Sequence, residues 1–285
     1  MTQQTINIKG NLISLDTPLV MGIVNITPDS FYKGSRKQSE IEIIERVQQI
    51  LEQGGTIIDI GAQSTTPSST LHSAKEELER LTPALSIIQR EFPEAILSVD
   101  TFYSEVAKAS VEEYGVAIIN DISGGQIDDQ MFSIVAELNV PYILMHMRGT
   151  PQTMQQLTKY DNLIQDIIFY FSEKISYLNS LGVNDIIVDP GFGFSKTLEQ
   201  NYELMAHLKY FHIFEIPLLV GVSRKSMLYR PLELTAEESL NATTVLNTYA
   251  LESGAKILRV HDVKEAVECV KLTCKLNKYT SQHLI

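Results

Sequence analysis

The segment TIIDIGAQSTTPSSTLHSAKEELERLTPALSIIQREFPEAILSVD, residues 56–100, holds two short apolar runs separated by a stretch with helical periodicity. The runs are TIIDIG at 56–61 and AILSVD at 95–100, and the stretch between them, 74–92, repeats apolar residues at intervals of three and four. Apolar runs without strict alternation are typical of parallel strands that are buried on both faces. The segment therefore predicts a strand–helix–strand unit with parallel strands.

The same pattern recurs along most of the chain. Further helical periods occupy 41–55, 161–182 and 236–254. In total there are eight apolar runs, at 20–25, 56–61, 95–100, 116–120, 141–146, 185–189, 217–223 and 256–261. Eight strands alternating with helices over about 250 residues are expected for an α/β fold of the TIM type, a (β/α)8 barrel.

An open doubly wound sheet is the competing architecture, since it also uses parallel strands. Its usual G-x-G-x-x-G motif does not follow the first run, which leads instead into Asn25 and ITPD (26–29). No Ser-, Gly- or Pro-rich linker divides the chain. We therefore expect one barrel domain over residues 1–285, with residues 1–19 as a short N-terminal extension.

The charge balance limits the partners. The chain has 285 residues, with 23 Lys and Arg against 35 Asp and Glu, for a formal net charge of −12. Nucleic acid and anionic membrane surfaces require a broad basic face, so we expect neither as the main partner.

The cellular location is expected to be the cytoplasm. The N-terminal residues show no signal-peptide pattern, and no apolar run approaches the ~18 residues of a membrane helix. The only two cysteines, Cys269 and Cys274, are spaced so that they would point in different directions on a helix, and we expect neither a disulfide nor a metal site from them.

Polar residues stand at the carboxyl ends of nearly all the apolar runs. Taken singly, an Asp or Asn at such a position is better explained as a helix cap or a turn residue, although Lys and Arg do not serve as N-caps. Taken together they predict an active site, because the carboxyl ends of barrel strands meet at one mouth. The residues are Asn25, Gln63, Ser64, Asp100, Asn120, Asp121, His146, Asp189, Ser223, Arg224, Lys225, Arg259 and His261.

The chemistry of this set indicates a ligand. Asp100, Asn120 and Asp189 can pair with a flat heterocycle that carries several N–H and C=O groups, because a buried carboxylate needs donors. Lys225, Arg259 and His261 are expected to add positive charge that suits an anion. Ser226 follows Lys225 and is expected to open a short helix.

Eight motifs then carry a resemblance to a known family. In chain order they are MGIVNITPDSF, DIGAQSTTP, SVDT, IIND, LMHMRGTP, DPGFGF, VSRKSM and LRVHDV, and they extend from residue 21 to residue 263. Together they closely resemble the dihydropteroate synthases, pterin-binding enzymes of folate biosynthesis. The resemblance implies a transferase that joins 6-hydroxymethyl-7,8-dihydropterin diphosphate to p-aminobenzoate and releases diphosphate.

The resemblance also implies roles for individual residues. Catalysis would depend on Asp100, Asp189, Lys225, Arg259 and His261. The pterin and its diphosphate would be bound by these five together with Thr65, Asn120 and Met145. The p-aminobenzoate would contact Phe31, Thr65, Pro67, Phe194 and Ser226. Asn25 resembles the ligand of a Mg²⁺ cofactor, and a homodimer is expected because barrels of this family tend to dimerise.

Some alternatives remain open at this point. Asp59 is better explained by a structural ion pair than by catalysis, and His146 by a contact with a backbone carbonyl inside the barrel. In the second loop, Thr66 stands where the family commonly has an arginine, and Gln63 where an acid is often found. For this reason a pterin-binding paralogue, methyltransferase-like or non-catalytic, is the alternative to the synthase.

Overall fold

The computed structural model describes residues 4–26, 36–63 and 71–280. All eight predicted apolar runs form strands, and these strands make one parallel sheet in the order β8-β7-β6-β5-β4-β3-β10-β9. The strands are β3 (Leu19–Asn25), β4 (Ile57–Gly61), β5 (Ile96–Asp100), β6 (Ile118–Asp121), β7 (Tyr142–Met145), β8 (Ile186–Asp189), β9 (Leu219–Val220) and β10 (Ile257–Val260).

The two edges of this sheet meet. Val188 in β8 forms a parallel bridge with Leu218, the residue before β9, and its amide donates a 2.9 Å hydrogen bond to the carbonyl of Pro217. The sheet thus closes into a barrel, which confirms the predicted TIM-type fold in a single domain.

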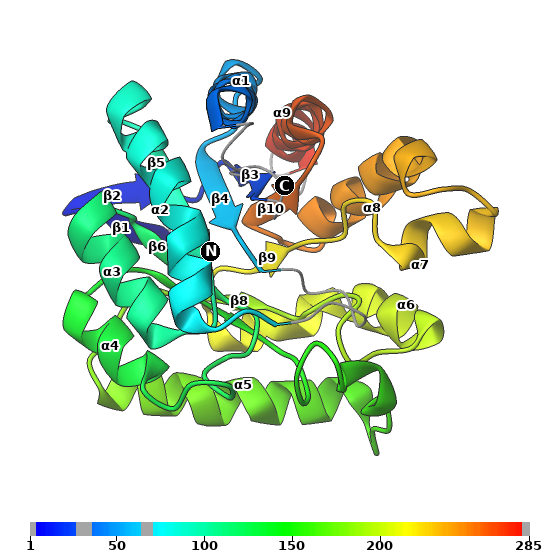
Figure 1. Cartoon of the computed structure of the whole chain (residues 1–285). Helices are drawn as coiled ribbons and strands as arrows, with labels where there is room; N and C mark the ends of the chain where they lie inside the picture. Colours follow the sequence, from blue (N-terminus) through cyan, green and yellow to red (C-terminus); the bar gives the residue numbers. More distant parts are fainter. Residues whose placement is uncertain (1–3, 27–35, 64–70, 281–285) are drawn as a thin grey trace.

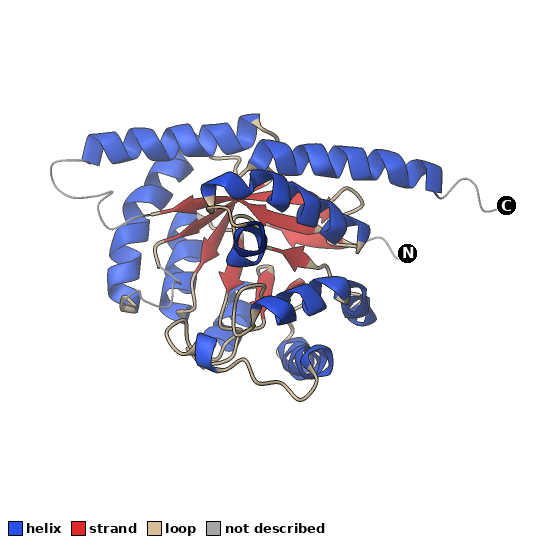
Figure 2. Ribbon diagram, turned by 90° about the vertical axis from the view of Figure 1, so that its right-hand side faces the viewer, coloured by secondary structure: helices blue, strands red, loops and turns tan. Residues whose placement is uncertain are grey.

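Helices surround the strands, as Figures 1 and 2 show. They are α1 (Arg36–Glu52), α2 (Ala74–Glu91), α3 (Ser104–Tyr114), α4 (Met131–Leu138), α5 (Leu163–Ser180), α6 (Leu198–Ala206), α7 (Ser226–Tyr229), α8 (Leu240–Glu252) and α9 (Val263–Thr280). The start of α2 illustrates the local cause: Ser73 and Glu76 form a capping box, in which each side chain satisfies a backbone N–H group of the other residue.

The two faces of each strand enter two different apolar clusters. Residues such as Ile58, Leu144 and Val220 point outward and pack beneath the helices. The residues that alternate with these along each strand point inward. At the amino-terminal end of the barrel the inward-pointing residues are Met21, Ile57, Ile118, Ile143, Ile187, Leu219 and Ile257. Burial on both faces explains why the strands lack the alternating pattern of an exposed sheet.

A β-hairpin covers the amino-terminal end of the barrel. Its strands β1 (Thr5–Ile8) and β2 (Asn11–Ser14) pair antiparallel, a feature that the sequence had indicated only as an extension. Ile6, Ile8 and Leu15 are buried in the same cluster as the inward-pointing strand residues. The hairpin therefore keeps water from this end, and the polar residues are gathered at the other end.

Replacing Leu15 with alanine tests this role of the hairpin. Leu15 is fully buried, so Leu15→Ala is expected to lower the free energy of unfolding by about 2–5 kcal/mol in urea denaturation. Leu12→Ala is the matched control, because Leu12 in the same hairpin is 71% exposed; it is expected to change stability by less than about 0.5 kcal/mol. Equal losses in the two variants would contradict the role of the hairpin as a plug.

Candidate active site

The predicted site residues converge because of the strand register. Asp100 at the end of β5 pairs with Asn120 in β6, and Met145 at the end of β7 pairs with Asp189 in β8. Arg259 enters from β10, which pairs with β3. The structure therefore brings these residues to one end of the barrel, opposite the hairpin.

An ionic network involving Arg259 occupies the middle of the barrel. Its guanidinium donates from Nε to Asp59 Oδ2 at 2.6 Å and from Nη2 to Asp100 Oδ2 at 2.7 Å. Asp59 is fully buried, and it also accepts hydrogen bonds from Ser98 Oγ at 2.6 Å and Asn120 Nδ2 at 3.1 Å. The expected ion pair of Asp59 is thus present, and it lies within the same network as Asp100 and Asn120.

The burial of this network shifts its pKa values. Burial lowers the pKa of Arg259, but the carboxylates of Asp59 and Asp100 outweigh that effect and the net shift is upward. Burial raises the pKa of Asp100, and the guanidinium of Arg259 opposes the rise. Arg259 consequently stays charged and stabilises carboxylates that would otherwise favour protonation.

Lys225 lies on the other side of the mouth, in the loop after β9. Its ammonium donates to the carbonyl of Phe192 and lies 4.8 Å from the centre of the Phe194 ring. Burial lowers the pKa of Lys225 to about 8, with Asp189 opposing the shift. Burial also raises the pKa of Asp189, and the positive charge of Lys225 opposes the rise, so each group favours the charged form of the other.

A cavity of about 520 Å³ adjoins Lys225. Phe194, Lys225 and Ser226 are among its lining residues, and Ser226 begins the short helix α7 as the sequence predicted. Two of the residues predicted for p-aminobenzoate, Phe194 and Ser226, therefore share one cavity. The other three, Phe31, Thr65 and Pro67, lie outside the described residues, as does Thr66.

The loop after β8 is held by a buried lysine that the sequence analysis did not single out. Lys196 Nζ donates to the carbonyls of Gly191 at 2.9 Å and Phe194 at 3.0 Å, and it contacts His146 Nδ1 at 3.1 Å. Gly191 has φ of +73°, and a Cβ there would lie 2.1 Å from the carbonyl oxygen of His146. The first glycine of DPGFGF, Gly191, is therefore required by close packing.

His146 has a buried side-chain partner in addition to the backbone contact that was expected. Its Nδ1 lies 3.1 Å from the ammonium of Lys196, and a backbone hydrogen bond also acts on the ring. Burial, reinforced by the charge of Lys196, lowers the pKa of His146 well below its usual value. His146 is thus a neutral structural residue that supports the loop.

His261 also differs from the expectation, in its charge. Burial, followed by the charges of Arg259 and Arg224, lowers the pKa of His261 to about 4. The imidazole is neutral at pH 7 and does not by itself add positive charge to the mouth. His261 and Asn25 both line a second cavity, of about 550 Å³, that extends toward α1 and α9.

The comparisons with known proteins agree with this geometry. A family model described as pterin binding enzyme matches residues 21–261. The dihydropteroate synthase of Escherichia coli K12 is 41% identical over 277 residues, covering 95% of this chain and 97% of the relative. The chain belongs to the pterin-binding enzyme family, among the dihydropteroate synthases.

Solved structures extend the agreement to the fold. The dihydropteroate synthase of Yersinia pestis in a sulfonamide drug complex superposes with a TM-score of 0.89 at 38% identity, covering 96% of this chain and all of the other. The enzyme of Xanthomonas albilineans with 4-aminobenzoic acid superposes with a TM-score of 0.87 at 32% identity, covering 97% and 99%. These matches confirm the predicted function, a transferase of folate biosynthesis.

This synthase also has a buried carboxyl next to Gln63, the residue two positions after β4. Glu77 in α2 is fully buried, and its Oε2 accepts a 2.7 Å hydrogen bond from Gln63 Nε2. Burial raises the pKa of Glu77 to about 7, although hydrogen bonds from Thr101 and Gln63 oppose the shift. Gln63 as an amide therefore avoids placing a second carboxyl against Glu77.

The raised pKa of Glu77 predicts a pH-dependent stability. The stabilisation that protonated Glu77 contributes is fully present below the pKa of the unfolded chain, near 4.5. It is lost as the pH rises to about 7, because the folded state keeps the proton to a higher pH than the unfolded state does. Glu77→Gln removes this loss. The free energy of unfolding of the variant minus that of wild type is therefore expected to rise by up to about 3 kcal/mol from pH 4.5 to pH 8. Denaturant titrations at both pH values measure the change.

The matched control for this prediction is Glu79→Gln, an exposed position on the same helix. Its stability relative to wild type is expected to stay the same at both pH values. A Glu77→Gln variant that also tracks wild type at both values would show that the pKa of Glu77 in the folded protein is not raised above its value in the unfolded chain.

Proposed function

We propose that the ionic network around Arg259 is the pterin site of this synthase. The observation that carries the proposal is the convergence of Asp100, Asn120 and Asp189 at one end of a closed barrel. Two carboxylates and an amide can pair with the N–H and C=O edge of a pterin, and burial makes such pairing selective. Met145 is buried beside them and supplies an apolar wall.

The reaction in this proposal needs little acid or base catalysis. The bond between the pterin methylene carbon and the diphosphate oxygen breaks, and the amine nitrogen of p-aminobenzoate then bonds to that carbon and loses a proton. Positive charge develops on the pterin as diphosphate leaves, and Asp100 and Asp189 stabilise it because their negative charges lie in a water-poor site. Arg259 and His261 are placed to bind the departing diphosphate.

Arg259 therefore has two sets of partners in this proposal. Without substrate its guanidinium is held by Asp59 and Asp100. Once a pterin pairs with Asp100, the Nη2 group of Arg259 is available for the ring face and the diphosphate. Asp59 keeps the Nε contact, so the guanidinium turns about a fixed point instead of moving freely.

Mg²⁺ fits this site as a companion of the diphosphate. Within the described ranges, no three His, Cys, Asp or Glu side chains are grouped so that they could hold a metal ion. Asn25 offers an amide oxygen at the end of β3, and Mg²⁺ commonly combines one or two protein oxygens with substrate phosphates and waters. Bound there, it would neutralise charge on the leaving group.

The cavity beside Lys225 is our candidate for p-aminobenzoate. Phe194 supplies an apolar wall, and Lys225 with Ser226 supplies donors for the carboxylate. The resemblance assigns Phe31, Thr65 and Pro67, which lie outside the described residues, to the same substrate. A cavity of this kind adjoining the pterin residues favours the synthase over a methyltransferase-like or non-catalytic barrel.

Variants of Asp189 and Lys225 test the assignment. Asp189→Asn removes a charge-assisted contact and is expected to weaken binding of the dihydropterin diphosphate more than tenfold, about 1.4 kcal/mol, in calorimetric titration. Lys225→Ala is expected to abolish turnover. Asp185→Asn is the matched control. Asp185 lies just before β8, at the end of the strand opposite Asp189, and accepts a hydrogen bond from the backbone N–H of Asn7. Near-wild-type binding and turnover in both test variants would refute the pterin site.

The oligomeric state that we propose is a homodimer formed through α8 and α9. Val245 and Tyr249 on α8 and Leu272, Leu276 and Tyr279 on α9 are 45–64% exposed, at spacings that place them on one face of each helix. The two helices pack against each other, so their exposed apolar residues form a continuous candidate interface.

Charged residues in this face should dissociate the dimer. Leu272→Lys combined with Leu276→Lys is expected to halve the mass measured by light scattering at micromolar concentration, because burying two charges is unfavourable. Ile213→Lys is the control, since Ile213 is 71% exposed and lies outside both helices, in the segment Leu208–Phe214. An unchanged mass in the double variant would place the interface elsewhere.

For its location we propose the cytoplasm. Cys269 is buried and Cys274 is half-buried, and both are free thiols, which fits a reducing compartment. Across residues 4–26, 36–63 and 71–280, no helix has the length and apolarity needed to cross a membrane.

A further inference from the structure

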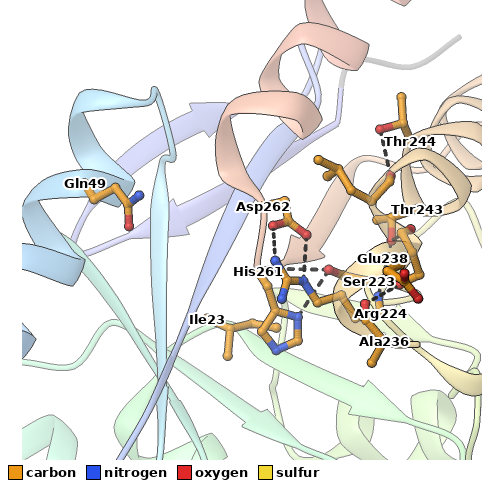
Figure 3. A network of polar contacts seen from close by, with 12 residues as sticks. Ile23, Gln49, Ser223, Arg224, Ala236, Glu238, Thr243, Thr244, His261 and Asp262 are labelled. Atoms are coloured by element: carbon orange, nitrogen blue, oxygen red, sulfur yellow. Dashed lines mark hydrogen bonds and ion pairs between the residues drawn. The ribbon is translucent and has the colours of Figure 1, made fainter. Parts of the chain in front are cut away.

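An ion pair without a role in the proposed chemistry lies beside the mouth. Arg224 Nε donates to Asp262 Oδ2 at 3.0 Å, and Arg224 Nη2 donates to Asp262 Oδ1 at 2.6 Å. The contact is therefore bidentate, the geometry in which an arginine fixes a carboxylate most firmly. Figure 3 shows the pair together with Ser223 and His261.

Both members are direct neighbours of proposed catalytic residues. Arg224 stands between Ser223 and Lys225 in the loop after β9, and Asp262 follows His261 in the loop after β10. Ser223 Oγ accepts the backbone N–H of His261 at 3.1 Å and lies 3.2 Å from His261 Nδ1. The side chains of Ser223 and Arg224 therefore both connect the loop after β9 to the loop after β10.

The backbone at Arg224 needs this support. Its φ is +57°, a left-handed conformation that is unfavourable for a side chain of this size. Its amide donates to Thr243 Oγ1 at 3.3 Å, and Thr243 in turn donates to the carbonyl of Ser239 at the start of α8. A strained residue that is held from two sides usually serves a position that the chain must keep.

Arg46 in α1 holds the other side of His261. Its Nη2 donates to the carbonyl of His261 at 2.7 Å, and its Nε donates to the carbonyl of Ile23 at 3.2 Å. Ile23 lies two residues before Asn25, so Arg46 connects the end of β3 to the loop after β10 through hydrogen bonds. His261 is therefore fixed on one side by Arg46 and on the other by Ser223.

We propose that the Arg224–Asp262 pair is a positioning clamp for the synthase reaction. It holds the loop of Lys225 at a fixed place relative to His261, and its effect on the reaction comes from this position. Both side chains also line the cavity that contains Asn25 and His261. The proposal rests on the proposed roles of Lys225 and His261.

The exposure of the pair argues against a role in folding alone. The side chain of Arg224 is 36% exposed and that of Asp262 is 14% exposed. Ion pairs near the surface contribute about 0–1 kcal/mol to stability. A misplacement of catalytic groups by about 1 Å can cost about 10²-fold in rate. The clamp should therefore affect turnover much more than folding.

A double-mutant cycle tests the clamp. Arg224→Gln and Asp262→Asn each keep roughly the size of the side chain, and each is expected to lower kcat about 10- to 100-fold with smaller changes in KM for the two substrates. The kcat of the double variant is expected to fall no further than that of the more impaired single variant, because all three variants lack the same contact. Asp262→Glu keeps a carboxylate and is expected to retain most of kcat.

Two controls separate positioning from stability. Arg90→Gln breaks an exposed Arg–carboxylate pair with Glu40 elsewhere on the protein and is expected to leave kcat unchanged. The urea midpoint of all variants is expected to stay close to wild type. Unchanged kcat in the single variants, multiplying losses in the double variant, or a kcat loss that follows a fall in the urea midpoint would each overturn the clamp.

The wild-type assay distinguishes this proposal from the function itself. If wild-type protein does not release diphosphate from the two substrates, the proposed function fails. If wild type turns over and the clamp variants do so at the same rate, only the clamp fails.

Discussion

The site depends on one constraint: a closed barrel has to stabilise charged residues in its interior. Arg259 satisfies this constraint by bridging Asp59 and Asp100, which come from two other strands. Breaking such a contact would leave a buried charge without a partner, which is strongly destabilising. The network is also the proposed pterin site. A ligand that binds there has to replace the hydrogen bonds and ionic contacts that it displaces with polar contacts of its own. Specificity for a flat, nitrogen-rich ring follows from this replacement, because a hydrocarbon offers no donors to Asp100.

The sequence predicted the strands and most of the mouth for physical reasons. Strands buried on both faces need continuous apolar runs, and polar residues at their carboxyl ends converge in any closed parallel barrel. The sequence could not predict partners that depend on packing. Lys196 appears as an ordinary lysine until the loop after β8 folds around it, and His261 appears basic until burial lowers its pKa. The Arg224–Asp262 pair joins residues 38 positions apart, and only the fold brings them together.

The net charge of −12 fits the anionic substrates once its distribution is considered. Among the described residues, Arg259 and Lys225 contribute positive charge at the mouth, and both are half-buried near carboxylates. His261 is neutral in the protein without substrate, so a bound diphosphate would raise its pKa and favour proton uptake. An acidic protein can therefore bind a diphosphate, because the local field at the mouth matters more than the total charge.

The most direct test of the account is diphosphate release by the purified protein. With 6-hydroxymethyl-7,8-dihydropterin diphosphate, p-aminobenzoate and Mg²⁺ all present, we expect stoichiometric formation of 7,8-dihydropteroate and diphosphate. Omitting p-aminobenzoate or chelating the metal should abolish steady-state product formation. Tight binding of the pterin without any product, in the presence of both substrates and Mg²⁺, would contradict the central claim and indicate a pterin-binding barrel that is not a synthase.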